Sequence, residues 1–239
     1  MDERPAADVA FVCAMPMELR PLARKLRLRK ETVGGVPVYA GSLGTKRVVA
    51  IVTGMGTQLA TAGVARLLDA VATGRIVVVG ITGAVDNNTP IGTLVLPEIV
   101  VDSATGTEHR ADQLGDTTPH GKMWTTDTLT TDPDQVARLR EDGVVSLDME
   151  TAAIAAACEA RGVPWSVVRV ISDRASDGSV DDEVFAMSNQ DGTPNPRAVL
   201  RFFLRHPTRL PRMARLARGA MLATQKAAAV AVSAVEAHA

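Results

Sequence analysis

The chain has 239 residues, of which 46% are apolar and 3% aromatic, and its formal net charge is −1. A chain of this length can bury about 70–75% of its unfolded surface, which suits one large α/β domain or two small ones. The near-neutral charge argues against a nucleic-acid-binding protein. There is no signal-peptide pattern, and Cys13 and Cys158 lie in apolar runs like buried free thiols, so the expected location is the reducing cytoplasm.

Short runs rich in valine and isoleucine alternate with helical patterns along the chain. A helix is expected over residues 57–73, where apolar side chains share one face, and another over Thr151–Arg161, which Gly162 and Pro164 would end. Strands that alternate with helices predict an α/β sheet covered on both faces. The runs expected to form buried strands are Val9–Cys13, Val48–Val52, Ile76–Val79, Thr93–Leu96, Val144–Leu147 and Ser166–Val170.

Residues 102–135 are polar and rich in threonine, aspartate and glycine. They are predicted to be a long loop region, and long loops in compact domains are often functional. His109 and His120 lie in this region. No metal-ligand spacing surrounds either histidine, so both are expected at the surface and no metal is expected.

Residues 192–239 form a basic tail with helical patterning, and no acidic residue occurs between Gly192 and Val235. Pro207 and Pro211 are expected to divide the tail into two helices. We therefore expect a main domain over residues 1–191 and a basic helical extension over residues 192–239, packed on that domain or flanking it. The arginines recur every three or four residues, broadly along one side of a helix: Arg197, Arg201, Arg205, Arg209, Arg212, Arg215 and Arg218.

Two interpretations of these arginines remain open. In the first, they form a solvated face on a helix that packs against the domain. In the second, residues 197–218 lie on an anionic membrane surface, since a basic amphipathic helix is attracted to anionic lipid.

Glycines and acidic side chains follow the predicted strands. Because ligands bind at the carboxyl ends of the strands in an open α/β sheet, these residues are expected to converge at one edge of the sheet. The glycine turns alone would be weak evidence, since such turns are often only tight strand-to-helix connections. The segments concerned are Ala14 to Glu18, Thr53 to Thr57, Gly80 to Ala84, Asp148 to Glu150, and Ile171 to Asp173.

The segment Asp148-Met149-Glu150-Thr151-Ala152-Ala153, followed by Arg169-Val170-Ile171-Ser172-Asp173, resembles the nucleoside phosphorylase/nucleosidase family. The likeness is greatest to 5′-methylthioadenosine/S-adenosylhomocysteine nucleosidases and spans roughly residues 8–101 and 144–190. It implies a three-layer α/β/α sandwich with a central mixed sheet, in which residues 1–191 form the nucleosidase catalytic domain. It also implies a homodimer, no cofactor and a place in methionine salvage.

The resemblance implies a role for each matching residue. Glu150 would accept hydrogen bonds from the ribose 2′- and 3′-hydroxyls, and Met149 would form an apolar floor under the sugar. Asp173 would protonate N7 of the base, and Glu18 would activate the attacking water. Arg169 and Ser172 would orient these carboxylates, and the remaining residues expected to bind substrate are Met55, Gly56, Ile81, Thr82 and Gly83.

The chemistry requires Asp173 to be protonated while Glu18 stays ionised, so the two environments must push the pKa values of these carboxyls apart. Without the resemblance, Glu150 at a helix start could be only a partner of the helix dipole. In the family, an acidic residue at position 173 suits a 6-aminopurine. The resemblance therefore implies hydrolytic cleavage of a 5′-substituted adenosine with release of adenine.

Several alternatives remain open. The phosphorylases of the family use an arginine and a hydroxyl residue at the positions of Val78 and Ile81, and their absence favours water over phosphate as the nucleophile. The typical nucleosidases also carry a small hydroxyl residue at position 81, and Trp124 and Leu129 are the nearest candidates for the side chain that stacks on the base.

The tail resembles that of hopanoid-associated relatives, which implies adenine removal from a lipid-linked adenosine such as adenosylhopane. The rivals are phosphorolysis of the same nucleosides and a nucleoside-binding protein without turnover.

Overall fold

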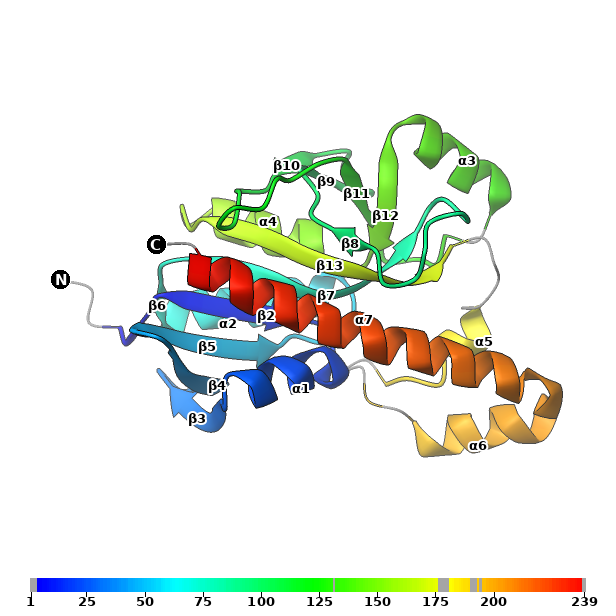
Figure 1. Cartoon of the computed structure of the whole chain (residues 1–239), viewed down its shortest axis with the longest axis horizontal. Helices are drawn as coiled ribbons and strands as arrows, with labels where there is room; N and C mark the ends of the chain where they lie inside the picture. Colours follow the sequence, from blue (N-terminus) through cyan, green and yellow to red (C-terminus); the bar gives the residue numbers. More distant parts are fainter. Residues whose placement is uncertain (1–3, 131, 176–180, 190–192, 194, 238–239) are drawn as a thin grey trace.

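The computed structural model describes residues 4–130, 132–175, 181–189, 193 and 195–237. Within these residues an 11-stranded mixed sheet forms the centre of the molecule (Figure 1). Its middle consists of parallel strands, β5 (Lys46–Val52), β2 (Val9–Cys13), β7 (Ile76–Ala84) and β13 (Trp165–Arg174). These strands are rich in valine and isoleucine and almost wholly buried, as expected for strands covered on both faces.

Antiparallel strands complete both sides of the sheet. On one side β4 (Val36–Leu43) pairs with β5 and with β3 (Arg29–Val33). On the other side β12 (Val144–Asp148) pairs antiparallel with the last residues of β7. The remaining strands are β8 (Leu94–Val95), β9 (Ile99–Asp102), β10 (Glu108–Arg110) and β11 (Lys122–Thr125), with β1 (Ala6–Ala7) and β6 (Ala72–Thr73) in a separate pair.

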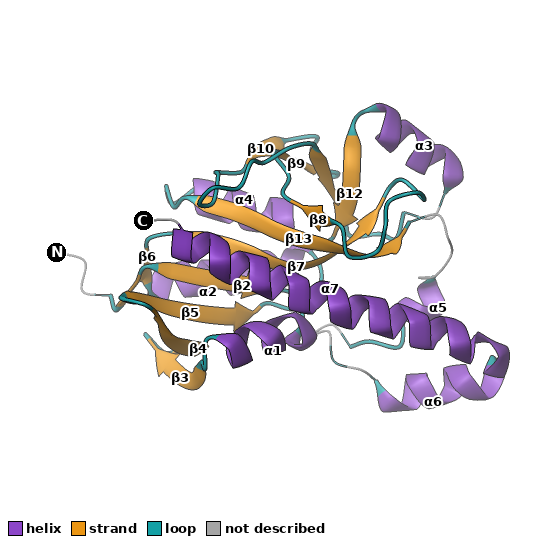
Figure 2. Cartoon of the chain, viewed as in Figure 1, coloured by secondary structure: helices purple, strands orange, loops and turns teal. Residues whose placement is uncertain are grey.

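Helices cover both faces of the sheet, so the predicted three-layer arrangement is confirmed (Figure 2). Helices α2 (Thr57–Ala70) and α4 (Thr151–Glu159) pack on one face through one apolar cluster. Helices α1 (Pro16–Lys25) and α7 (Leu210–Ala237) pack on the other face through a second cluster. The remaining helices are α3 (Pro133–Glu141), α5 (Asp182–Phe185), α6 (Pro196–Arg205) and the 3₁₀ turn η1 (Pro207–Arg209).

The two halves of α7 have different surroundings. Ala223, Ala227 and Ala231 are fully buried, and these small side chains let the second half of the helix lie close to β13 and α1. The first half continues past the sheet beside α6 (Figure 1). The predicted helix break at Pro207 is confirmed, while Pro211 lies in the first turn of α7, where a missing backbone donor is tolerated. The predicted domain boundary between residues 191 and 192 lies outside the described residues.

The structure corrects the interpretation of residues 102–135 as a loop region. This segment contains β10 and β11, and α3 begins within it at Pro133. His109 is only 7% exposed, and its Nδ1 lies 2.7 Å from Oε2 of Glu159, so the prediction that it lies at the surface was wrong. His120 is exposed, as predicted. Neither strand was recognised because each is short and is stabilised by pairing with residues distant in the sequence.

The described part of the chain contains no helix that is both long and apolar enough to cross a membrane. The same residues contain no group of three or more histidine, cysteine, aspartate or glutamate side chains placed to hold a metal ion. Both cysteines are buried free thiols.

Candidate active site

A cavity of about 320 Å³ lies where β2, β7, β12 and β13 approach one another, between the sheet and helices α1 and α7. This volume is at the lower end of the range for small-molecule sites. Of the predicted site residues, Gly56 is not part of the cavity lining, although its backbone contacts a residue that is. The predicted residues that line the cavity are Glu18, Met55, Ile81, Thr82, Gly83, Met149, Glu150, Arg169, Ser172 and Asp173.

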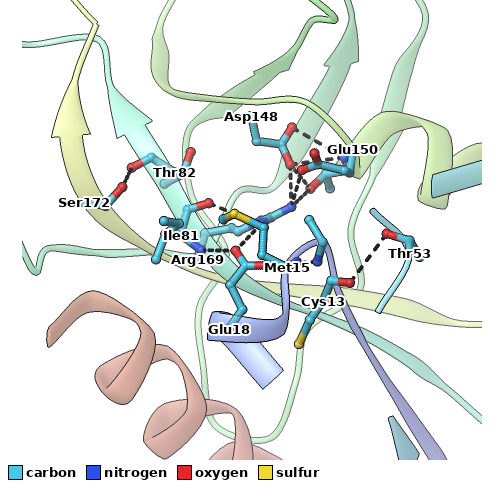
Figure 3. A network of polar contacts seen from close by, with 12 residues as sticks. Cys13, Met15, Glu18, Thr53, Ile81, Thr82, Asp148, Glu150, Arg169 and Ser172 are labelled. Atoms are coloured by element: carbon cyan, nitrogen blue, oxygen red, sulfur yellow. Dashed lines mark hydrogen bonds and ion pairs between the residues drawn. The ribbon is translucent and has the colours of Figure 1, made fainter. Parts of the chain in front are cut away.

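Glu18 lies at the start of α1, with its carboxylate directed into the sheet (Figure 3). Its Oε2 accepts hydrogen bonds from the backbone N–H groups of Ala14 (2.8 Å) and Met15 (2.9 Å). Its Oε1 accepts a bond of 2.9 Å from the N–H of Ile81. Burial raises the pKa of Glu18 above its ordinary value, and Arg169 and these N–H groups oppose that rise. Glu18 thus both accepts a hydrogen bond from the backbone N–H of Met15, the N-cap residue of α1, and forms part of the cavity.

Gly80 makes room for this carboxylate. A Cβ atom at this position would lie 2.2 Å from Oε1 of Glu18 and 2.5 Å from Nη1 of Arg169. Gly80 and Gly83 were predicted to form a turn after the strand, and that prediction was wrong, because β7 continues to Ala84. The glycine is needed for close approach of two side chains rather than for a change of chain direction.

Arg169 occupies the centre of the polar cluster and is 1% exposed. Its Nη2 donates to Oδ2 of Asp148 (2.6 Å) and lies 3.4 Å from Oε2 of Glu150. Its Nη1 donates to the carbonyl oxygen of Ile81 (3.1 Å) and lies 3.4 Å from Oε1 of Glu18. One guanidinium therefore contacts three buried carboxyl groups (Figure 3).

The cluster has three carboxyl groups and one guanidinium, and this excess of acidic groups shifts the pKa values of its members. Burial raises the pKa of Glu150 to about 8, the charge of Asp148 adds to the rise, and Arg169 opposes it. Burial disfavours the charge of Arg169, yet Asp148, Glu18 and Glu150 together raise the pKa of its guanidinium. Burial and the charge of Asp148 therefore favour the protonated form of Glu150, while the three carboxyl groups favour the charged form of Arg169.

Glu150 sits at the N-terminus of α4, but its side chain does not cap that helix. Its Oε1 instead accepts a 2.9 Å hydrogen bond from the N–H of Gly56, which follows β5 with a φ of 94°. Only glycine adopts that φ readily, so the loop after β5 depends on Gly56 to present its N–H to Glu150. These contacts disfavour the explanation of Glu150 as a mere partner of the helix dipole.

Asp148 is a site residue to which the sequence analysis assigned no role. It is 7% exposed and accepts hydrogen bonds from the hydroxyl of Thr125 (2.6 Å), from the N–H and hydroxyl of Thr151, and from Arg169. The sequence did contain a signal for this role, since Asp148 is an acidic residue at a strand end, two positions before Glu150. Thr125 gave none, because it belongs to the segment interpreted as a loop.

Asp173 is oriented by its neighbour, since the hydroxyl of Ser172 donates to its Oδ1 at 2.5 Å. The register between β13 and β7 shifts between Ile171 and Asp173, so the strand carries a bulge at Ser172. Bulges next to a site change the direction of a side chain. A Cβ at Gly83 would lie 3.2 Å from Oδ2 of Asp173, so Gly83 also keeps space beside this carboxyl.

The rest of the cavity wall is largely apolar and includes Leu216 and Ala220 from α7. Of the two candidates for a side chain that stacks on a base, Leu129 lines the cavity, whereas Trp124 packs in a small cluster beside Val85. Val78, at the position where the phosphorylases carry an arginine, is buried in the core.

Comparisons with known proteins agree with this geometry. The family model of the phosphorylase superfamily matches residues 8–112 and 104–205. A 5′-methylthioadenosine/S-adenosylhomocysteine nucleosidase from Exiguobacterium sp. is 30% identical over 200 residues, which are 71% of this chain and 86% of that protein. The protein of the same name from Glaesserella parasuis is 26% identical over 197 residues, with 70% and 86% of the two chains covered.

Solved structures resemble the whole chain. A methylthioadenosine/adenosylhomocysteine nucleosidase from S. pneumoniae with the transition-state inhibitor MT-ImmA has a TM-score of 0.69 at 19% identity, covering 96% of this chain and 99% of that one. Futalosine hydrolase from Helicobacter pylori has a TM-score of 0.70 at 15% identity, covering 96% and 97%. At these identities the likeness establishes the shared fold, as the sequence predicted.

Proposed function

Because this chain belongs to the phosphorylase superfamily, we propose that it is a purine nucleosidase that hydrolyses the N-glycosidic bond of a 5′-substituted adenosine and releases adenine. The curated relatives that support this are nucleosidases for 5′-methylthioadenosine and S-adenosylhomocysteine. The observation that carries the proposal is the way in which Glu18 is held in the cavity. It supports the choice of water over phosphate more directly than the substitutions at Val78 and Ile81 do.

Three backbone N–H groups meet at the base of the cavity, from Ala14, Met15 and Ile81, and all of them donate to Glu18. Such N–H groups would otherwise be the natural ligands of a phosphate. Arg169 is also engaged by three carboxyl groups. A phosphate dianion would need hydrogen-bond donors where the carboxylate of Glu18 lies. The site therefore favours a neutral nucleophile such as water.

In the proposed reaction the bond between C1′ and N9 breaks, and its electron pair leaves with the adenine. Asp173, oriented by Ser172, gives a proton to N7 of the leaving base, while Glu18 takes a proton from the water that attacks C1′. On Glu18 the accepting atom is Oε1, which has one short hydrogen bond and a longer 3.4 Å contact with Arg169. Each proton transfer contributes about 10²–10⁴-fold to the rate.

Glu150 and Met149 hold the ribose in this proposal. Glu150 accepts hydrogen bonds from the 2′- and 3′-hydroxyls, and Met149 lies under the sugar ring. Burial raises the pKa of Glu150 to about 8, and hydrogen bonds donated by the two hydroxyls oppose that rise because they stabilise the carboxylate. Arg169 is a positioning residue that contacts Glu18 and Glu150 together, and Asp148 fixes Arg169.

The test is adenine release from methylthioadenosine, adenosylhomocysteine and 5′-deoxyadenosine, each with and without phosphate. We expect release at the same rate in both conditions, and a rate about 10²–10⁴-fold lower for Glu18→Gln. Release only with phosphate would make the protein a phosphorylase. Binding of these nucleosides without any release would make it a nucleoside-binding protein.

A second substrate candidate is a lipid-linked adenosine, because Leu216 and Ala220 of α7 give the cavity an apolar wall next to Met17. A 5′ hydrocarbon chain would lie against such a wall, whereas the amino-acid end of adenosylhomocysteine would not. Comparing kcat/KM for adenosine with a 5′ alkyl chain and for methylthioadenosine separates the two candidates. A higher value for the alkyl nucleoside favours the lipid-linked substrate.

We also propose that the enzyme is a homodimer, as its family resemblance implies, and that it is cytoplasmic, as its two buried free thiols indicate. Sedimentation of the purified protein tests the dimer, and fractionation of cells tests the location. A monomer at working concentration would contradict the first part.

A further inference from the structure

Residues 196–222, which comprise α6, η1 and the first half of α7, form a helical hairpin that we call the arm. It extends beyond the sheet, away from the second half of α7 (Figures 1 and 2). Side-chain contacts join η1 to α6 within the arm and to Asp181 and Glu183, which precede it. Phe202 is buried at its centre, and the guanidinium of Arg209 lies 4.9 Å from that ring and pairs with Asp181 and Glu183.

The outer surface of the arm carries large apolar side chains that the arm itself does not cover. On α6, Leu200 and Leu204 are 61% and 75% exposed, and they lie one turn apart. Among the described residues outside the arm, only Ile91 and Val145 are comparable, at 38% each. On α7 the exposed residues at positions i, i+4, i+7 and i+11 form an apolar stripe: Leu210, Ala214, Ala217 and Met221.

Exposed arginines flank these apolar residues. Arg197 and Arg201 lie within one turn of Leu200 on α6, and Arg215 and Arg218 lie beside the stripe on α7. No acidic residue occurs between Gly192 and Val235, and the acidic residues Asp181 and Glu183, which lie outside that segment and pair with the arm, contact Arg209. The arm is therefore both apolar and strongly cationic on its outer surface.

Exposed leucines beside exposed arginines favour some binding partners of the arm over others. A second copy of the arm would bring arginines against arginines, which costs free energy when like charges are placed together. A nucleic acid would satisfy the arginines but leave the leucines in water. An anionic lipid surface satisfies both, because leucines enter the acyl boundary while arginines reach the headgroups. We propose that the arm docks this protein onto the surface of an anionic membrane.

The docking surface continues to the candidate active site. Leu216 and Ala220, within the arm, line the cavity, while Met221 lines a groove between α1 and α7. Arg20, Arg24 and Lys25 of α1 line the same groove and extend the cationic surface onto the main domain. A protein docked in this way would present its cavity beside the lipid surface.

The test is flotation of the full-length protein with vesicles of phosphatidylcholine alone or mixed with phosphatidylglycerol, at low and at high salt. We expect flotation only with the mixed vesicles at low salt. Arg197→Gln with Arg201→Gln should weaken partition about fivefold for each arginine removed. Leu200→Ser with Leu204→Ser should weaken it at least about tenfold for each leucine.

Arg138→Gln with Arg140→Gln provides the matched control, because both arginines are exposed on α3 and carry the same charge. This pair should leave flotation unchanged, and every variant should keep the circular dichroism and adenine release of the wild type in solution. Failure of the wild type to float with mixed vesicles at low salt overturns the proposal. It is also overturned if Leu200→Ser with Leu204→Ser changes the oligomeric state by light scattering, since a second copy would then cover the arm. Flotation does not depend on catalysis, so neither result bears on the proposed reaction.

Discussion

The candidate active site and the arm contain charge in opposite physical settings. In the site, Arg169 and three carboxyl groups are removed from water and held by short contacts. On the arm, arginines remain in water beside exposed leucines. Removing one partner from a buried charged group leaves the others unpaired, whereas a solvated charge has little effect on folding. Changes in the site should therefore affect stability and catalysis together, and changes of the exposed arginines and leucines on the arm should affect neither.

The largest effect is expected for Arg169→Met. It leaves Glu18, Asp148 and Glu150 buried without a cation, and breaking a buried pair in this way costs about 3–5 kcal/mol of unfolding free energy. Urea denaturation measures this cost. The loss should be smaller at low pH, where the carboxyls take up protons, and an equal loss at pH 5 and pH 8 would contradict the account.

Gly80→Ala should have the next largest effect. The added methyl group overlaps Glu18 and Arg169, so these side chains must move, and a displacement of about 1 Å can cost about 10²-fold in rate. The expected cost in stability is about 1–3 kcal/mol, as for overpacking elsewhere. Steady-state adenine release and urea denaturation measure the two effects. Wild-type kcat in this variant would mean that the two side chains do not approach over Gly80 during the reaction.

The pKa of Glu150 predicts a pH dependence of stability. Its pKa is raised from 4.5 to about 8 in the folded protein, so the folded state holds this proton more tightly than the unfolded state. The resulting stability is fully present below pH 4.5 and is lost as the pH rises through 8, at up to about 1.4 kcal/mol per pH unit. Glu150→Gln should flatten this slope in urea titrations at several pH values. An unchanged slope would assign the proton to another group.

The smallest effect on the isolated protein is expected on the arm. Arg215→Gln with Arg218→Gln should change the unfolding free energy by less than about 0.5 kcal/mol, because both side chains are exposed. Adenine release from a water-soluble nucleoside should also be unchanged. A large loss of either would mean that these arginines support the site, and the contrast between the two regions would fail.

The predictability of these regions from the sequence differs for physical reasons. The central strands were predictable because burial on both faces requires continuous runs of valine and isoleucine, and β2 matches its prediction residue for residue. Two short strands, β10 at the edge of the sheet and β11 between β9 and β12, were not predictable, since their stability comes from pairing with distant residues. The ends of β7 and β13 were placed too early, because glycine and serine in those positions resemble turn residues.

In the site, the motif around Glu150 and the acidic residues after the strands predicted which side chains line one cavity. The sequence pattern could not predict which of these charged side chains contact one another. That one guanidinium contacts Glu18, Asp148 and Glu150 depends on the register of three strands and on the space left by Gly80.

In the proposed reaction the nucleophile is water held by Glu18. The most direct test is cleavage of methylthioadenosine in ¹⁸O-labelled water with phosphate present, followed by mass spectrometry of the sugar product. We predict free methylthioribose with one ¹⁸O atom at C1′ and no sugar phosphate. Unlabelled methylthioribose 1-phosphate as the product would contradict the account.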